Sequence, residues 1–348
     1  MKNGRPTIKQ IAEKTGVSIG TVHRAIYGKE GVGEETRKRI LAEVEKMNFQ
    51  IDAAASSLKR KAINIAVVLP KAKGEDQYYF RGIWKGIKEA AAELEKYKFH
   101  FIYIESEYRM DKIALELQTL YDTMLDDING LITISDTSET NEWIARFYKQ
   151  GVITVLISSY GRSENYFCSI KVDHKKAGKL AAEFLKTAIH KKAGRILVLT
   201  GNASLFSNQN YAGGFLEEIK RLGVKNELLA IDGFGREDIE DRMRQLLKEE
   251  QIAAVFCCNA RNTYVLCQLA EELKISDVLL LGTDVFLELQ SYFESDILTA
   301  CIYQSNKEQG KRAVEVLYQY LSTGSRNQGQ EFVPIGLVMK GNYEYYIN

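Results

Sequence analysis

The first side chains whose types and spacing suggest chemistry lie close to the amino terminus. Between Thr7 and Ile26 the sequence predicts two short helices around a tight turn at Thr15-Gly16-Val17. Val22 falls on the inner face of the second helix, while small and polar side chains fall on its outer face. This is the shape of a helix-turn-helix, whose second helix is narrow enough to enter the major groove of DNA.

The outward N-terminal positions of that second helix are Ile19, Gly20, Thr21, His23 and Arg24. Arg24 can donate two hydrogen bonds to a guanine, whereas Ile19 offers only apolar contact, for example with a thymine methyl group. Thr7, Ser18 and Thr21, together with the amides at helix starts, are the expected phosphate partners. The alternative for Arg24 is a solvated arginine on a helix surface.

Three short helices are expected to position these residues. Thr7, with Gln10 three residues later, predicts a capping box at the start of the first helix, and Ser18 caps the second. The third helix is expected to begin near Glu34, because an acidic first turn suits the helix dipole. Helices this short can share one small core, so residues 1–50 are predicted to form an all-α head.

Charge is divided unevenly along the chain. Residues 1–62 contain 13 Lys and Arg against 7 Asp and Glu, a net charge of +6. The remainder contains 34 against 39, a net charge of −5. A basic head on an acidic body suits the binding of DNA phosphates by the head alone, although a solvated basic domain is the alternative.

Residues 51–62 connect the head to the body and are rich in alanine. This segment has no core of its own and is too short for a stable isolated helix. We expect it to become helical only when a partner and DNA hold it. Leu58 precedes Lys59-Arg60-Lys61, and an apolar wedge beside cations suits an opened minor groove. A flexible linker is the alternative.

From Ile63 onward, short apolar runs alternate with amphipathic stretches of helical periodicity. Eight strands are expected, at Ile63–Leu69, Phe99–Ile104, Gly130–Ile134, Val152–Ile157, Arg195–Leu199, Leu228–Ile231, Ala253–Cys257 and Val278–Leu281. Helical patterns between them include Gly82–Lys96, Ile113–Leu125, Lys175–Ile189, Gly213–Leu222 and Asn262–Leu273. Such alternation predicts an α/β body of parallel sheets with helices on both faces.

The pattern divides near Val172-Asp173, which predicts two similar lobes with a cleft between them. Ligands in open α/β sheets bind beyond the carboxyl ends of the strands. The loops at those ends carry hydrogen-bonding groups and aromatics, with Tyr79 and Arg261 among the candidate ligand contacts, which suits a polyhydroxylated ligand stacked on a ring face. The alternatives are core packing for Tyr79 and Phe80, a helix cap for Asp284 and a turn for Asn259.

The sequence offers no signature of catalysis. The loop that starts at Gly201 lacks a following Gly-Lys-Ser/Thr, and no Gly-x-Ser-x-Gly elbow is present. Five cysteines and four histidines have no metal-ligand spacing, so neither a metal nor a cofactor is expected. A polar amino terminus, and no apolar run long enough to span a bilayer, predict a cytoplasmic protein with reduced thiols and no membrane contact.

The head and linker resemble the N-terminal domain of the lactose-repressor (LacI) family. The residues that carry the resemblance are Thr7–Ile26, Val32–Arg37 and the segment that ends at Leu58. It implies a homodimer whose paired heads bind a palindromic operator in double-stranded DNA, with hinge helices that insert leucines at its centre. On this resemblance the base-reading positions are Ile19, Gly20 and Arg24, and the minor-groove leucine is Leu58.

The body resembles the periplasmic sugar-binding-protein fold that this family shares. The residues that carry this resemblance are Val172–Gly178, Ala181-Ala182, Gly213–Phe215, Asn259, Gly282–Asp284 and Gln304. It implies one lobe of about 63–171 and 304–330, a second of about 172–303 and 331–348, and three crossings between them. It also implies ligand contacts at Phe80, Asp136, Ser158, Gln209, Tyr211, Asn259, Asp284 and Gln304.

Three positions depart from the family pattern. Ala260 stands where several members have an Asp, Tyr211 where an Arg is frequent, and Ser158-Ser159 where some pentose binders have a charged pair. These departures favour a more aromatic or less hydroxylated ligand. The expected function is a ligand-responsive repressor of carbohydrate uptake or catabolism genes, released by a small sugar-like effector. The alternative is a corepressor-dependent repressor, or an activator, that senses a non-sugar metabolite.

Overall fold

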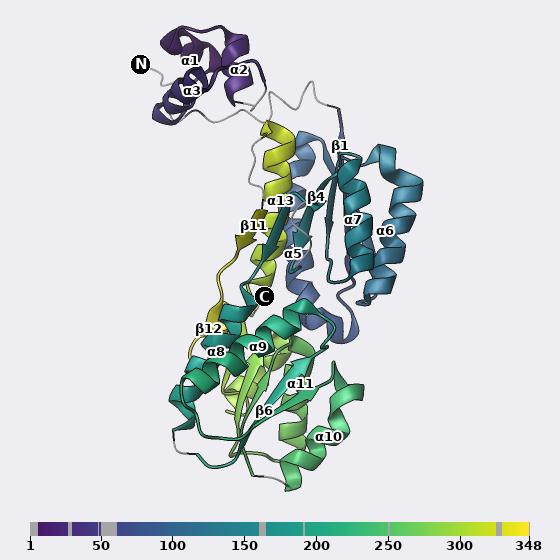
Figure 1. Ribbon diagram of the computed structural model, residues 1–348, viewed down its shortest axis with the longest axis vertical. Helices are drawn as coiled ribbons and strands as arrows, with labels where there is room; N and C mark the ends of the chain where they lie inside the picture. Colours follow the sequence, from purple (N-terminus) through teal and green to yellow (C-terminus); the bar gives the residue numbers. More distant parts are fainter. Residues whose placement is uncertain are drawn as a thin grey trace.

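A small helical head precedes a two-lobed α/β body in the computed structural model (Figure 1). The structure describes residues 6–26, 30–47, 49, 61–159, 165–190, 192–249, 251–324 and 329–347. The head contains the helices α1 (Ile8–Thr15), α2 (Ile19–Ile26) and α3 (Glu34–Lys46). They enclose a shared core of Ile11, Ala12, Val22, Ala25 and Ile40.

The helix boundaries of the head follow the expected capping chemistry. Thr7 and Gln10 bond each other reciprocally at the start of α1, and the oxygen of Ser18 accepts from the amide of Thr21 at 3.0 Å. Gly16 ends α1 with a φ of 66°, a left-handed conformation that costs glycine least. This turn lets α2 fold back onto α1. The capping box, the Ser18 cap and the start of α3 are therefore confirmed.

The first sheet is parallel throughout and runs in the order β11-β5-β4-β3-β1-β2. Its strands are β1 (Ile63–Pro70), β2 (Phe99–Ser106), β3 (Gly130–Thr133), β4 (Ile153–Ile157), β5 (Cys168–Lys171) and β11 (Gly329–Phe332). Its helices are η1 (Gly74–Asp76), α5 (Gln77–Leu94), η2 (Glu95–Tyr97), α6 (Met110–Met124), η3 (Leu125–Asp127), α7 (Ser138–Lys149) and α13 (Asn306–Thr323). We call this unit lobe 1.

The second sheet runs β12-β10-β9-β8-β6-β7, and only its edge strand β12 is antiparallel. Its strands are β6 (Arg195–Gly201), β7 (Leu228–Asp232), β8 (Ile252–Cys257), β9 (Leu279–Thr283), β10 (Ala300–Tyr303) and β12 (Gly336–Val338). Its helices are α8 (His174–Ile189), α9 (Phe206–Arg221), α10 (Arg236–Glu249), α11 (Ala260–Glu272), η5 (Leu287–Leu289), α12 (Gln290–Glu294) and η6 (Tyr343–Tyr345). We call this unit lobe 2.

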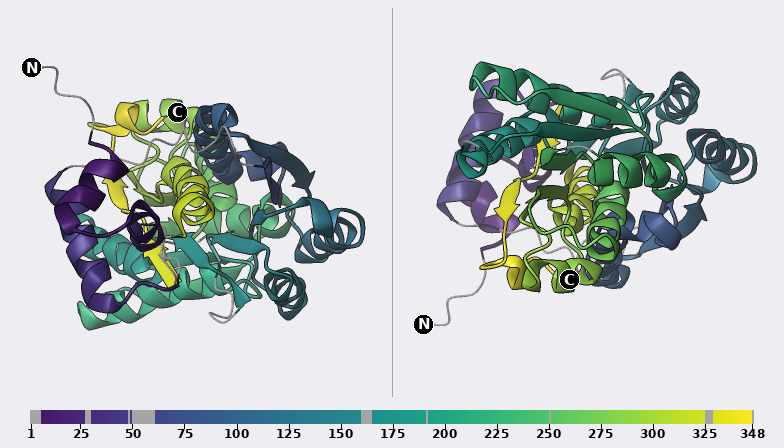
Figure 2. Two further views of the ribbon diagram at one scale, coloured as in Figure 1. Left: turned by 90° about the horizontal axis from the view of Figure 1, so that it is seen from above. Right: turned by 90° about the horizontal axis from the view of Figure 1, so that it is seen from below.

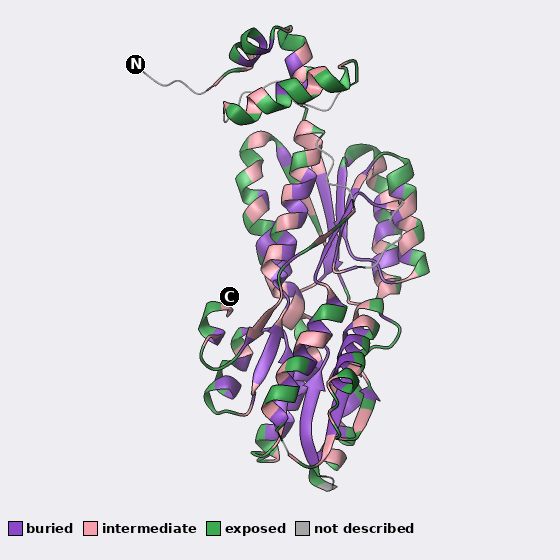
Figure 3. Ribbon diagram, turned by 60° about the vertical axis from the view of Figure 1, so that its left-hand side comes forward, coloured by how far each residue is buried: buried purple, intermediate pink, exposed green. Residues whose placement is uncertain are grey.

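Helices surround the strands of both lobes when the molecule is viewed along its long axis (Figure 2). The inner strands of both sheets are almost wholly buried, whereas strands at the sheet edges such as β2, β7 and β11 are only partly buried. The helices bury one face and expose the other (Figure 3). In the part of the chain that the structure describes, no helix combines the length and apolar character needed to cross a bilayer. The chain passes from one lobe to the other after β5, after β10 and after β11.

All eight strands expected from the sequence are present, within two residues of their expected bounds. Four short strands were not expected: β5, β10, β11 and β12. Each precedes or follows a crossing between the lobes, so its position depends on the sheet it joins rather than on a long apolar run. Helix α9 begins at Phe206 rather than at Gly213, so residues 206–212 are helical where no helix was expected.

Glycines allow α8 and α9 to pack backbone against backbone. A Cβ atom on Gly178 would lie 2.1 Å from the carbonyl oxygen of Tyr211, and one on Gly214 would lie 2.2 Å from that of Lys175. Neither distance is compatible with van der Waals contact. A side chain at either position would therefore push the two helices apart.

We predict that Gly214→Ala lowers the free energy of unfolding of lobe 2 by roughly 1–3 kcal/mol, the usual cost of overpacking. Gly213→Ala is the matched control, because no atom lies within 4 Å of a Cβ at that position. It should be neutral or stabilising by up to about 1 kcal/mol, since alanine is the better helix former. Urea unfolding followed by circular dichroism measures both. Equal effects of the two variants would contradict the close contact.

Candidate functional site

Helix α2 presents an open face on the surface of the head. Ile19, Gly20 and Arg24 are exposed, and Thr21 and His23 are half-buried. Gly20 and Arg24 lie four residues apart and so share one side of the helix. Thr7 is exposed at the start of α1, and Leu58 lies outside the described residues.

The opposite face of α2 is fixed to the rest of the head. Val22 and Ala25 are buried, and a guanidinium nitrogen of Arg37 on α3 donates to the carbonyl of Ala25 at 3.2 Å. The hydroxyls of Ser18 and Thr21 lie 2.9 Å apart at the N-terminal end of α2. The arrangement is a rigid helix with a polar N-terminus and one exposed arginine.

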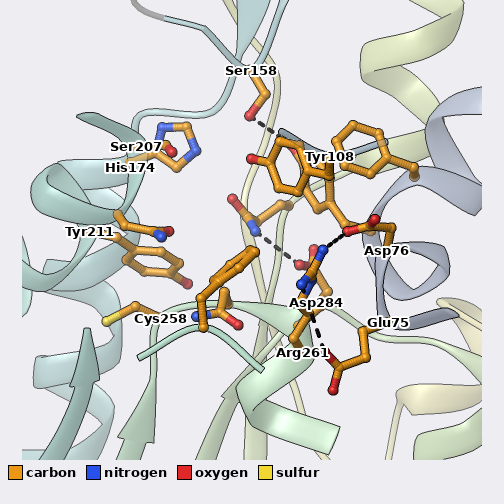
Figure 4. Close-up of a pocket in the computed structure, with 17 residues that line it drawn as sticks. Glu75, Asp76, Tyr108, Ser158, His174, Ser207, Tyr211, Cys258, Arg261 and Asp284 are labelled. Atoms are coloured by element: carbon orange, nitrogen blue, oxygen red, sulfur yellow. Dashed lines mark hydrogen bonds and ion pairs between the residues drawn. The ribbon is translucent and has the colours of Figure 1, made fainter. Parts of the chain in front are cut away.

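A cavity lies between the two lobes, where the carboxyl ends of their strands meet (Figure 4). Seventeen residues line it, drawn from both lobes and from the crossing after β10. They are Glu75, Asp76, Tyr79, Phe80, Tyr108, Ser158, His174, Ser207, Asn208, Tyr211, Phe234, Cys258, Asn259, Ala260, Arg261, Asp284 and Gln304.

The lobe 2 wall of the cavity carries buried polar atoms that have no protein partner. The side-chain nitrogen of Gln304 donates to one carboxylate oxygen of Asp284 at 3.1 Å, which leaves Asp284 Oδ1 and Gln304 Oε1 without a hydrogen bond among the described residues. Asn259 caps α11 by accepting from the amide of Asn262 at 2.9 Å, while its Nδ2 is unpartnered. Burial raises the pKa of Asp284 to about 7, and hydrogen bonds from Asn306 and Gln304 oppose the shift.

The lobe 1 wall presents an ordered tyrosine. The hydroxyls of Tyr79 and Ser158 lie 2.7 Å apart, and the side chain of Gln309 donates to Tyr79 at 3.4 Å. Burial raises the pKa of Tyr79, so its phenol stays protonated. Ser158 and Asp284 have φ values of 50° and 68°, a region that non-glycine residues rarely adopt. Such strain is found where a functional site requires it.

Arg261 spans the mouth of the cavity from lobe 2 to lobe 1. Its Nη2 contacts a carboxylate oxygen of Asp76, and its Nη1 lies 3.7 Å from Glu75. The guanidinium carbon lies 4.3 Å from the ring centre of Phe234 and 5.9 Å from that of Tyr108. Both charged groups of the Asp76–Arg261 pair are largely buried, and burial raises the pKa of Asp76 despite the neighbouring arginine.

The structure brings eight of the ten expected ligand residues to this cavity: Tyr79, Phe80, Ser158, Tyr211, Asn259, Arg261, Asp284 and Gln304. Phe80 also packs in the lobe 1 core, and Asn259 also acts as a cap. Asp136 and Gln209 are not among the lining residues. Asp136 is buried, and the side chain of Gln209 is exposed, with its amide donating to the carbonyl of Ala203 at 2.6 Å.

Sequence reasoning missed several lining residues, and two kinds of signal would have found them. Tyr108 and Phe234 follow expected strands, so the strand-end rule applied to every strand would have included them. Asn208 lies three residues before Tyr211, which was among the expected contacts, so placing the start of α9 at Phe206 would have put Asn208 on the same face as Tyr211. The remaining residues not selected were Glu75, Asp76, His174, Ser207, Cys258 and Ala260.

The comparison with known families matches both parts of the chain. Residues 7–52 match the bacterial regulatory proteins of the lacI family, and residues 65–325 match the family described as periplasmic binding protein domain. The chain belongs to the LacI family of transcriptional regulators. It is a DNA-binding regulator with an effector domain, and not an enzyme.

Two relatives of this chain are named as repressors. The "HTH-type transcriptional repressor PurR" of Pasteurella multocida is 26% identical over 92% of this chain and 94% of its own length. The "Ribose operon repressor" of Bacillus subtilis is 27% identical over 69% of this chain and 68% of its own. Among solved structures, the glucose-galactose binding protein GanP of Geobacillus stearothermophilus is 19% identical, with a TM-score of 0.70, and covers 81% of this chain and 99% of its own. The last similarity shows the fold.

We predict that Arg24→Ala abolishes selective operator binding, because each lost guanine contact costs about 1–3 kcal/mol per chain. The free energy of unfolding should change by less than about 1 kcal/mol, since the side chain is exposed. Lys46→Ala on α3 removes the same charge away from the α2 face and should keep the preference for operator over random DNA. Footprinting measures both, and a protected operator with Arg24→Ala would disprove the assignment.

The buried carboxyl of Asp284 predicts a pH dependence. The folded state binds its proton up to about pH 7, whereas the unfolded chain releases it near 3.8, so stability falls as pH rises between these values and levels above them. Asp284→Asn lacks this loss. As pH rises from 3.8 to about 7, the variant should therefore gain a few kcal/mol in free energy of unfolding relative to wild type. Each pKa unit corresponds to about 1.4 kcal/mol. Urea unfolding from pH 5 to 8 tests this, and parallel curves would contradict it.

Proposed function

We propose that this LacI-family regulator represses genes of carbohydrate uptake or catabolism and leaves its operator when a hydroxyl-bearing, sugar-like effector binds the interlobe cavity. In this proposal it acts in the cytoplasm as a homodimer on a palindromic operator. The head is residues 1–50, the hinge 51–62 and the body 63–348. The names of the ribose operon repressor and of the glucose-galactose binding protein support a sugar as effector class.

The observation that carries the effector proposal is the set of unpartnered polar atoms on the cavity wall. Asp284 Oδ1 and Gln304 Oε1 are acceptors, while Asn259 Nδ2 is a donor. The amide nitrogen of Gln304 already donates to Asp284, which fixes which end of the amide is the acceptor. A hydroxyl group both donates and accepts, so a ligand with several hydroxyls satisfies all of these atoms at once.

Aromatic side chains complete the wall and favour a ring. Phe80, Tyr108 and Phe234 line the same cavity, and Tyr108 and Phe234 approach each other from opposite lobes with ring centres 5.9 Å apart. Apolar ring faces beside a few convergent polar groups are typical of small-molecule sites. The C–H face of a sugar-like ring fits such a surface.

On the DNA side, we assign base contacts to Ile19, Gly20 and Arg24 and phosphate contacts to Thr7, Ser18 and Thr21, with His23 beside them. The exposed face of α2 and the basic head support this assignment. Leu58 completes the proposal as the minor-groove residue of the hinge.

Ligand and operator are coupled through the relative orientation of the lobes. Groups from both lobes line the cavity, so a ligand binds one lobe orientation more tightly than the other and shifts the equilibrium toward it. The proposed hinge precedes Ile63, the first residue of strand β1, which lies between β3 and the edge strand β2. A change of lobe orientation in a dimer changes the spacing of the two hinges, and the coupling is reciprocal.

We predict that an effector weakens operator binding by roughly 5- to 150-fold, the usual range of coupling between two sites. Genomic fragments selected by the full chain provide the operator, and fluorescence anisotropy with a panel of neutral sugars and cyclic polyols measures the shift. An Asn259→Ala/Asp284→Ala variant should keep operator binding and lose the response.

Gln209→Ala is the control, because that side chain bonds Ala203 and does not line the cavity. It should respond as wild type does. A normal response in the double variant would place the effector elsewhere. A compound that tightens operator binding would make the chain a corepressor-dependent regulator instead.

A further inference from the structure

The cavity is acidic, and its one described cationic side chain is already engaged. Glu75, Asp76, Asp284 and Arg261 are the Asp, Glu, Lys and Arg residues in its lining. His174 also lines it, but burial lowers the pKa of this imidazole to about 3, so it carries no charge at neutral pH. Lys171 lies outside the lining, where its ammonium group donates to the carbonyl of Ser159 at 3.3 Å.

Arg261 directs its charge away from a ligand. Its two terminal nitrogens face Asp76 and Glu75, and Phe234 covers its guanidinium plane at 4.3 Å. Only Nε is buried without a partner, so one N–H remains for a ligand in the cavity. Glu75 is held in place by a second contact, because its carboxylate accepts from the amide of Arg236 at 3.1 Å. Figure 4 shows both carboxylates directed at the guanidinium.

An anionic effector would therefore meet an uncompensated negative field. A buried charge is stable only when it is paired, and like charges placed together in a site shielded from water repel each other strongly. A phosphate or carboxylate would have to displace Asp76 or Glu75 from Arg261, and leave that carboxylate unpaired. A neutral hydroxyl displaces nothing, because it uses Nε of Arg261 and the unpartnered atoms of Asp284, Gln304 and Asn259.

We propose that the cavity selects an uncharged, hydroxyl-bearing effector and rejects its phosphorylated or carboxylated counterpart, and that Asp76, with Glu75, sets this selection by neutralising Arg261. The inference rests on the proposed function, since it names the charge class of the effector in the same cavity. It makes Asp76 a specificity-determining residue even though its carboxylate bonds the protein.

The test compares matched probes on the full chain by isothermal titration calorimetry: D-glucose with D-glucose 6-phosphate and D-gluconate, D-ribose with D-ribose 5-phosphate, and myo-inositol with its monophosphate. We expect at least one neutral parent to bind wild type, and its anionic counterparts to bind at least about tenfold more weakly. Displacement by the neutral parent distinguishes binding in the cavity from binding of phosphates to the basic head.

Asp76→Asn should release the guanidinium of Arg261 and tighten cavity binding of the anionic probes at least about tenfold relative to wild type. Binding of the neutral parent should change by less than about threefold. Glu288→Gln is the matched control: this carboxylate also spans the lobes, 2.9 Å from Arg81, but does not line the cavity. It should leave the preference for neutral probes unchanged. Arg261→Met should not bind anionic probes any more tightly than wild type does.

The outcomes separate this inference from the proposed function. The charge selection is overturned if wild type binds an anionic probe more tightly than its neutral parent and the neutral parent displaces that probe. The effector cavity itself would then remain supported. A gain of anion binding in Glu288→Gln as large as that in Asp76→Asn overturns the role of Asp76. Absence of binding by every probe to wild type and variants, or a bound probe that leaves operator affinity unchanged, counts against the proposed function itself.

Discussion

A buried charged pair, Asp76 with Arg261, links the charge of the cavity to the contact between the two lobes. Arg261 and Asp76 belong to different lobes, and their contact exists only while the lobes are close. Closure removes both groups from water, and the raised pKa of Asp76 shows that burial outweighs the attraction of Arg261 for that carboxylate. A buried pair of this kind contributes little net stability. The lobes are therefore not locked by charge, which suits the change of lobe orientation in the proposed mechanism.

Other side chains also make contacts between the two lobes. Tyr78 from lobe 1 stacks on Phe286 of lobe 2 with ring centres 4.5 Å apart, and Arg81 pairs with Glu288. These contacts lie beside the cavity, so opening breaks them together with the Asp76–Arg261 pair. The crossing after β10 joins the two sides, because Gln304 contacts Asp284 while Asn306 donates to the carbonyl of Tyr79 at 3.1 Å. A ligand that binds Asp284, as proposed, would thus contact a segment that leads directly into α13 of lobe 1.

The sequence predicted the parts of this arrangement that are local and missed those that depend on the partner lobe. Long apolar runs such as Ile63–Leu69 can only be buried strands, and the strand-end rule then located Ser158 and Asn259. Strand β5 is four residues long and contains the buried Lys171, so its pattern resembles a loop until β4 and β11 pair with it. Arg261 was recognised as a cavity residue, but its partner is 185 residues away and is fixed only by closure of the lobes.

In the proposed mechanism, the limited polar chemistry of α2 is what allows the orientation of the lobes to control DNA binding. Its exposed face offers one arginine beside Ile19 and Gly20, so in the proposed complex each head would make few direct base contacts. Most of its affinity must come from phosphates, which fix the position of the head but do not identify a sequence. In the proposed dimer, selectivity then requires both heads on one operator at the same time. Simultaneous binding is lost when the geometry no longer spans the two half-sites, even if each head is unchanged. A head with few base contacts depends on its partner head for selective binding. A small change of hinge spacing can therefore release such a dimer from its operator.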